Sequence, residues 1–179
     1  SPDPVTSVFS GGLEKLGAFV AFMAFVRLTP VGTMIDAIGL TTGQYAIAFL
    51  GALTIVFGTL MAIRQDDAKK LLAYSSMSNG GYIILALALM TDTSISGALY
   101  HVLAHALAST AAFLAIGAVA RQTGTTKMSE LGGMIHKMPI TYLVYLIAII
   151  SMAGIPPMGG FISKWLIFQS VISEGLIFL

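Results

Sequence analysis

The chain has 179 residues, of which 56% are hydrophobic and only 9% are charged, and its formal net charge at pH 7 is +1. Soluble domains carry about 25% charged residues, so this composition excludes a water-soluble fold, and the near-neutral charge argues against nucleic-acid binding. The sequence contains no cysteine, which excludes disulfides, thiolate-bound iron–sulfur clusters and cysteine-bound zinc within this chain.

Five apolar stretches follow one another along the chain, separated by short loops that hold most of the charge. A helix needs about 20 mostly apolar residues to cross a membrane, and in lipid only helices and closed barrels satisfy their backbone hydrogen bonds. The alternating pattern of a barrel is absent. We therefore predict an all-α fold, a single polytopic membrane helix bundle whose last span is broken. The expected spans are residues 4–28, 43–63, 71–90, 95–120 and 139–179, with the break near 154–160.

The first span carries a buried charge, Lys15. At about 1.5 Å per residue, Lys15 lies about 20 Å from the end of the span near Leu28. A charge at that depth costs at least about 2.5–3.5 kcal/mol, so Lys15 is a candidate proton carrier. Glu14 is adjacent but points about 100° away on a helix, so it is not automatically the partner. A structural ion pair with another helix is the alternative interpretation.

The loops between the spans alternate in charge. Loops 64–70 and 121–138 each carry three cations, whereas loops 29–42 and 91–94 each carry a single aspartate. The positive-inside rule then puts the two cationic loops on the cytoplasmic, matrix or stromal side. We expect a prokaryotic plasma membrane, or an organelle inner or thylakoid membrane.

The third span has one polar face, because its polar side chains are spaced i, i+3, i+4 and i+7. Such groups can hold water, or they can hydrogen-bond to a neighbouring helix, and the sequence leaves both interpretations open. The residues of this face are Ser75, Ser78, Asn79 and Tyr82.

The fourth span carries His101, His105 and Ser109 at i, i+4 and i+8, which puts them on one stripe. Two histidines at this spacing can bind a metal or haem, or they can pass protons, because imidazole titrates near neutrality. No other ligand cluster is evident, so a proton relay is favoured and no metal site is predicted. His105 is the stronger candidate because His101 is expected nearer the membrane edge, and a packing role for one histidine remains open.

The fifth span is interrupted by Pro156-Pro157 and Gly159-Gly160, and Lys164 follows directly. Proline removes helix hydrogen bonds and glycine tolerates unusual backbone angles. Broken helices with a polar residue mark ion sites in transporters. The alternative is a plain loop with Lys164 as an interfacial anchor beside Trp165, but the apolar runs on both sides favour a broken helix.

Residues 67–76, Asp-Ala-Lys-Lys-Leu-Leu-Ala-Tyr-Ser-Ser, resemble the D-[IL]-K-[RK]-L-[LI]-A-Y-[ST]-S signature of the antiporter-like subunits of respiratory complex I (NADH:quinone oxidoreductase). That family also includes Mrp-type antiporter subunits and the membrane arms of energy-converting hydrogenases. The resemblance covers essentially the whole chain. Further similar stretches are 1–7, 97–105, 130–134, 138–139 and 153–165.

The resemblance implies half of an inverted-repeat transporter fold, in an internal fragment that runs from the eighth to the twelfth helix of the family. Lys15, His105 and Lys164 then fall on the family's proton-translocating residues: the bridging lysine, the histidine of the central polar axis and the titratable residue of the broken helix. Two positions depart from the pattern. Asn79 stands where many members have histidine, so a water chain would have to replace that relay step, and Ser109 stands where some subunits have lysine.

The implied function is a proton-translocating membrane subunit of a complex I-like NADH/quinone oxidoreductase or a related hydrogenase. Protons would pass from Lys15 through His105 and bound water to Lys164, supported by a polar path of His101, Ser75, Ser78, Asn79, Tyr82, Ser109 and Glu14. The resemblance implies no cofactor in this chain, and it implies that redox cofactors and quinone lie in partner subunits. The first alternative is an Mrp-type Na⁺/H⁺ antiporter subunit, and the second is a non-pumping membrane scaffold.

Overall fold

The computed structural model describes residues 17, 20, 34, 35 and 40–176. Lys15, Glu14 and nearly all of the expected first span therefore lie outside the described residues. The described chain begins with a two-residue antiparallel pair, β1 (Met34–Ile35) and β2 (Leu40–Thr41). The rest is helical, with six α-helices in the described part of the chain.

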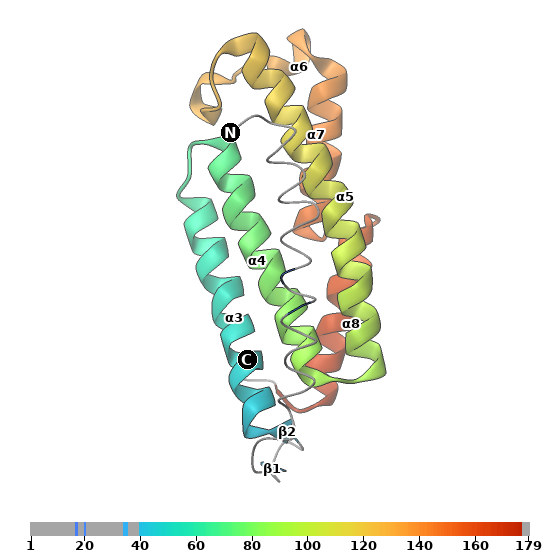
Figure 1. Cartoon of the computed structure of the whole chain (residues 1–179). Helices are drawn as coiled ribbons and strands as arrows, with labels where there is room; N and C mark the ends of the chain where they lie inside the picture. The colour runs from blue at the N-terminus through green and yellow to red at the C-terminus, as the bar shows by residue number, and fades with distance from the viewer. Residues whose placement is uncertain (1–16, 18–19, 21–33, 36–39, 177–179) are drawn as a thin grey trace.

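Two long antiparallel helices, α3 (Thr42–Ile63) and α4 (Ala68–Leu89), form a close pair (Figure 1). Glycine permits the close approach: a Cβ at Gly58 would stand 2.7 Å from the Ser78 nitrogen, and one at Gly51 would stand 2.8 Å from the Leu85 nitrogen. Small residues at contacts between membrane helices allow such packing.

The longest helix in the described part of the chain is α5 (Asp92–Thr123), which runs beside α4 and packs against the two last helices of the bundle, both described below. Thr91 and Ser94 form reciprocal capping hydrogen bonds at its start. Gly124, with a φ of +76°, ends it, as a left-handed glycine commonly does. Among the described residues, three helices, α3, α4 and α5, are long and apolar enough to cross a membrane.

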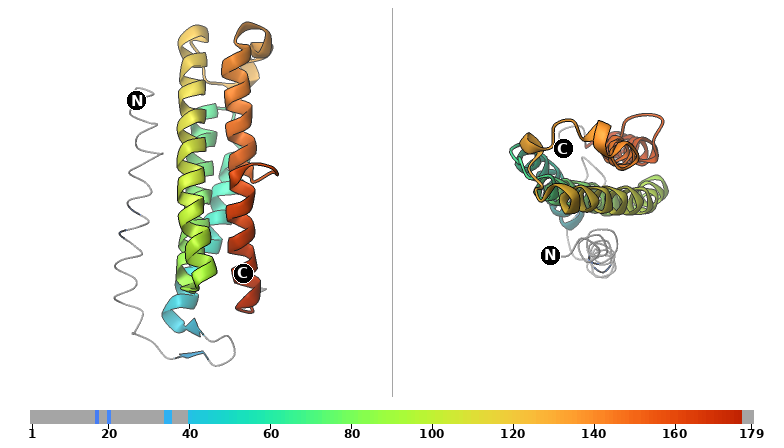
Figure 2. Two further views of the ribbon diagram at one scale, coloured as in Figure 1. Left: turned by 90° about the vertical axis from the view of Figure 1, so that its right-hand side faces the viewer. Right: turned by 90° about the horizontal axis from the view of Figure 1, so that it is seen from above.

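The predicted break in the last span separates α7 (Pro139–Ala153) from α8 (Gly159–Ser173). Figure 2 shows the two helices one below the other along α5, with the non-helical segment projecting sideways between them. Gly154, with a φ of +82°, ends α7. A Cβ at Gly160 would collide with the Ser151 carbonyl, so only glycine fits at the start of α8.

Several helix bounds differ from the expected ones. The helix expected from residue 71 begins at Ala68, because Asp67 accepts a hydrogen bond from the Lys70 nitrogen and caps it. The helix expected over 95–120 runs from Asp92 to Thr123, because the polar residues at both ends also belong to the helix although they lie outside the apolar run. The helix expected to reach residue 179 ends at Ser173, and Gly175 adopts a φ of +71° beyond it.

The two cationic loops touch each other at one end of the bundle. The Asp66 carboxylate accepts hydrogen bonds from the Ser129 nitrogen at 3.0 Å and the Ser129 hydroxyl at 2.7 Å. The Asp67 carboxylate accepts one from the Thr126 hydroxyl at 2.6 Å. We call this group of four residues the loop clasp. The Ser129 hydrogen bonds hold the pKa of Asp66 below its usual value.

The 3₁₀ helix η2 (Met128–Glu130) and the short helix α6 (Met134–Lys137) connect the loop clasp to α7. Lys127 and Glu130 form an exposed ion pair at 3.4 Å beside the loop clasp. The apolar core of this end packs α4, α5 and α7 together around Leu72, Phe113 and Met152. The loops and this core together hold α7 beside α4 and α5.

Candidate functional site

Lys164 lies on the first turns of α8 and reaches back across the helix break. Its ammonium donates to the carbonyl oxygens of Met152, at 2.8 Å, and Ala153, at 3.3 Å. These are carbonyls of the last turn of α7, which have no partner inside their own helix. The negative end of a helix dipole favours a cation there. The geometry thus joins the two half-helices through one charged side chain.

The aromatic ring of Tyr82, on α4, covers the same ammonium. The Lys164 nitrogen lies 4.8 Å from the ring centroid, within the range of a cation–π contact. The same ring lies 5.9 Å from Phe168 in an edge-on arrangement and 5.8 Å from His101. Tyr82 therefore connects α4, α5 and α8 at the level of the break.

A cavity of about 320 Å³ opens beside Lys164. A space of this size can hold several water molecules if polar groups line it. The polar side chains of the predicted face on α4 all contribute to its wall. The polar lining consists of Thr59, Ser75, Ser78, Asn79, Tyr82 and Lys164. The structure thus brings the predicted face and Lys164 together around one space.

Ser78 also links two helices. Its hydroxyl lies 2.9 Å from the Thr59 hydroxyl and donates to the Ile55 carbonyl at 3.1 Å, both on α3. Interhelical bonding, one of the two interpretations left open by the sequence, thus applies to Ser78. Asn79 is different, because its amide nitrogen donates to the Ser75 carbonyl of its own helix at 2.8 Å.

His101 contacts the residue next to Lys164. Its Nδ1 lies 2.8 Å from the Ser163 hydroxyl oxygen. That hydroxyl donates its own proton to the Gly160 carbonyl at 2.9 Å, so Nδ1 of His101 must be the donor. Neutral His101 then has Nε2 as its acceptor nitrogen. This pair joins α5 to the start of α8.

His105 lies one turn further along α5, and the two imidazole centroids are 6.0 Å apart. His101 and His105 are both 2% exposed. This burial within the bundle does not measure distance from the membrane edge, so the ranking of His105 above His101 stays a prediction. Ser109 is also buried, but its hydroxyl donates to the Ala106 carbonyl of its own helix. In the described part of the chain, no group of three or more histidine, cysteine or acidic residues could hold a metal ion.

The partners that organise this site were not predicted from the sequence. Ser163 immediately precedes Lys164, and a hydroxyl beside a candidate proton carrier is a signal that could have identified it. No sequence signal connects His101 to Ser163, because they are 62 residues apart. The hydrogen bonds from Lys164 to Met152 and Ala153 could not be predicted either, because they go to backbone carbonyls, which every residue type has.

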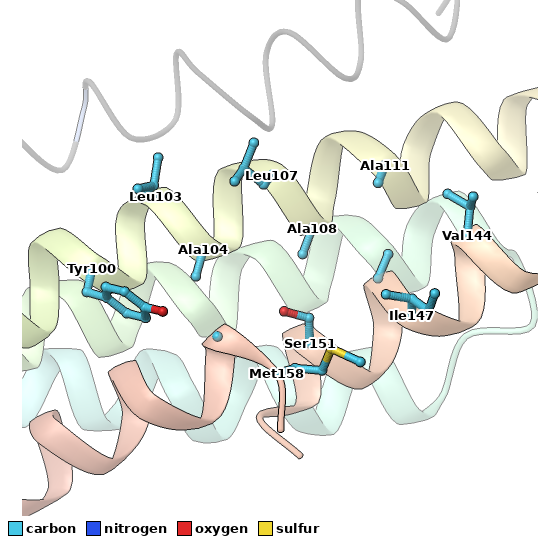
Figure 3. A pocket seen from close by; sticks show the side chains of 12 residues that line it. Tyr100, Leu103, Ala104, Leu107, Ala108, Ala111, Val144, Ile147, Ser151 and Met158 are labelled. Carbon is cyan, nitrogen blue, oxygen red and sulfur yellow. The ribbon is translucent and has the colours of Figure 1, made fainter. Parts of the chain in front are cut away.

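A second hollow, a groove of about 420 Å³ between α5 and α7, is almost entirely apolar (Figure 3). Leu103, Leu107 and Ile147 line it with other aliphatic side chains, and its polar groups are those of Tyr100 and Ser151. No lysine, histidine or acidic residue lines this groove.

Known membrane proteins resemble this chain along its whole length. The family model described as NADH:quinone oxidoreductase/Mrp antiporter, TM, matches residues 1–179. An NADH-quinone oxidoreductase subunit of Desulforudis audaxviator is 34% identical, over 98% of this chain and 34% of its own length. A Na⁺/H⁺ antiporter subunit of Alkalihalophilus pseudofirmus is also 34% identical, over 98% of this chain and 34% of its own length.

A solved structure gives the same fold. A chain of the membrane-bound sulfane sulfur reductase, an archaeal respiratory membrane complex, matches with a TM-score of 0.83 and 33% sequence identity. The match covers 98% of this chain and 35% of that chain. The present chain thus spans about a third of the length of the curated relatives that it matches.

Proposed function

We propose that this chain, which belongs to the NADH:quinone oxidoreductase/Mrp antiporter transmembrane family, forms part of a subunit that moves protons through a complex I-like redox complex. The chain is an antiporter-like membrane segment of a polytopic protein. In the proposed role it carries out no redox chemistry itself. Electron transfer and quinone binding would take place in partner subunits, driven by NADH or, in a related complex, by hydrogen.

The observation that carries the proposal is the position of Lys164. Its ammonium lies at a helix break, joins two helix ends and borders a cavity whose wall combines polar and apolar side chains. Charged residues at membrane depth are costly and mark ion pathways by default. Non-helical backbone at that depth is tolerated where it lines a wet cavity. A purely structural anchor would not need the cavity.

The proposed driving force is a change of charge near Lys164. Two like charges repel strongly where the dielectric constant is low, so a second cation that approaches the cavity would expel the Lys164 proton. The α7 carbonyls and the Tyr82 ring stabilise the charged form until then. His101 and His105 would deliver the next proton along α5, and Lys15 is the proposed donor upstream of them.

The proposed topology has five spans with α7 and α8 as one broken span, which makes half of an inverted-repeat transporter. The contact between loops 64–70 and 121–138 through Asp66 and Ser129 supports a common side for both cationic loops. By the positive-inside rule, that side is the cytoplasm, matrix or stroma.

An Mrp-type Na⁺/H⁺ antiporter subunit is the second candidate function. The observation that favours it is the equal identity, 34%, to a redox-complex subunit and to an antiporter subunit. The two functions differ in their driving reaction. Proton movement that depends on electron transfer supports the redox complex, whereas proton movement that depends on a Na⁺ gradient supports the antiporter.

The test replaces Lys164 with Met in the full-length protein within its membrane complex. Proton uptake into inside-out vesicles is followed by the quenching of a pH-sensitive dye, and complex assembly is followed on native gels. We expect assembly to persist and proton uptake to be lost. Lys137→Met, which removes an exposed cation from the end of α6, before α7, is the matched control and should pump normally. Normal uptake in the Lys164→Met variant would refute the proposal.

A further inference from the structure

The side-chain amide of Asn79 forms a hydrogen bond through its nitrogen, and its oxygen has no hydrogen-bond partner among the described residues. The Asn79 side chain is 3% exposed. Its Nδ2 donates to the Ser75 carbonyl at 2.8 Å. A carbonyl oxygen only accepts hydrogen bonds, so this contact fixes which end of the amide carries the nitrogen. Oδ1 is consequently an acceptor in a fixed orientation.

The fixed acceptor has no hydrogen-bond partner among the described residues. Oδ1 of Asn79 is buried, yet none of the donors in residues 40–176 bonds to it. Buried acceptors are nearly always satisfied by protein or by ordered water, and an unsatisfied one costs free energy. Asn79 contributes to the wall of the cavity that also contains Lys164. That cavity is large enough and polar enough for water.

Lys164 has a donor left for the cavity. An ammonium has three N–H groups, and two of them are directed to the carbonyls of Met152 and Ala153. The remaining N–H is available on the side of Tyr82 and the cavity. Asn79 on α4 and Lys164 on α8 therefore both line the same cavity, and no direct hydrogen bond joins their side chains.

We propose that Asn79 is a positioning residue for proton transfer: its Oδ1 orients a cavity water that receives the proton released by Lys164. This role rests on the proposed function of Lys164. The N–H bond of the ammonium breaks as an O–H bond forms on the water, and that water passes a different proton to the next water in the cavity. Asn79 accepts a hydrogen bond throughout and neither gains nor loses a proton.

A water held by Asn79 explains how the chain functions without a titratable group at this position. A histidine at position 79 could take up the proton itself, because imidazole titrates near neutrality. Asparagine cannot, so it can serve only by holding water in place. The rigid amide restricts which way that water donates, which favours movement from Lys164 into the cavity.

The experiment compares four variants of the full-length protein in its assembled complex. Asn79→Leu has a similar size but no acceptor, and Asn79→His offers an acceptor and a titratable group. Ser170→Ala is the matched control, because Ser170 is buried, bonds only within α8 and does not line the cavity. Lys164→Met reports on the proposed function itself. Two quantities are measured in each variant. One is proton uptake, and the other is the rate of electron transfer when it is uncoupled from proton pumping.

We expect proton uptake to fall about tenfold in Asn79→Leu, the factor that corresponds to the loss of one net hydrogen bond, while uncoupled electron transfer stays unchanged. Asn79→His should restore uptake, and Ser170→Ala should not alter it. Normal uptake in Asn79→Leu while Lys164→Met abolishes it would overturn the inference but leave the proposed function intact. Normal uptake in Lys164→Met would overturn both.

A second measurement keeps the inference testable if Asn79→Leu fails to assemble. A cryo-electron microscopy map of the unmodified complex, at a resolution that shows ordered water, should contain a water within hydrogen-bond distance of Asn79 Oδ1, in the cavity beside Lys164. A protein donor on Oδ1 in that map, or a dry cavity, would overturn the inference.

Discussion

Replacing Ser163 with Ala should destabilise the bundle by a measurable amount. The Ser163 side chain is fully buried, and its oxygen accepts from Nδ1 of His101 at 2.8 Å. Removing a partner from a buried donor costs about 1–3 kcal/mol. The hydroxyl also links α5 to α8 directly before Lys164, so its loss should loosen the start of α8.

The assay is thermal unfolding of the purified full-length protein in detergent, followed by the loss of helical circular dichroism. Ser170→Ala is the control, because that hydroxyl bonds only within α8 and its loss should be nearly neutral. Equal unfolding of Ser163→Ala and Ser170→Ala would refute the reasoning about His101.

Two further predictions concern the helix break and the loops. Gly160→Ala should prevent stable accumulation in the membrane, because its Cβ would collide with the Ser151 carbonyl, whereas Gly132→Ala, with open space around it, should accumulate normally on immunoblots. The pKa of Asp66 is lowered from 3.8 by its Ser129 hydrogen bonds, so its stabilising effect is present above pH about 4 and is lost as pH falls through the lower folded value. Limited proteolysis of the loops should therefore rise in acid, and Ser129→Ala, which keeps the backbone hydrogen bond to Asp66 but loses the hydroxyl, should weaken that pH dependence; an unchanged profile in Ser129→Ala would contradict this account.

The helices could be predicted because membrane spans are long apolar runs and their loops are polar. The break was also predictable, since Pro156-Pro157 and the glycines after it cannot continue a helix. The exact ends were not, because caps such as Asp67 act through single side-chain hydrogen bonds. Residues at and near the caps are polar, so a helix is longer than the apolar run from which it is predicted.

The site was only partly predictable, for a physical reason. Spacing on one helix shows which side chains share a face, and it correctly grouped Ser75 and Asn79 on the wall of one cavity. Spacing on one helix does not show which residues of a neighbouring helix pack against that face. No pattern on α5 showed that His101 would lie against Ser163 of α8, and the ranking of His105 above His101 by membrane depth stays a prediction. Lys15 remains a prediction, since it lies outside the described residues.

The most direct test of the central claim is the proton-to-electron ratio of the complex with Lys164→Arg. Arginine keeps the positive charge and can still donate to the α7 carbonyls, but it does not give up its proton in proteins. The variant therefore separates an anchor from a proton carrier. If Lys164 carries protons, the complex should assemble and transfer electrons with a reduced proton ratio. An unchanged ratio would show that Lys164 only holds the two half-helices together, and would contradict the account.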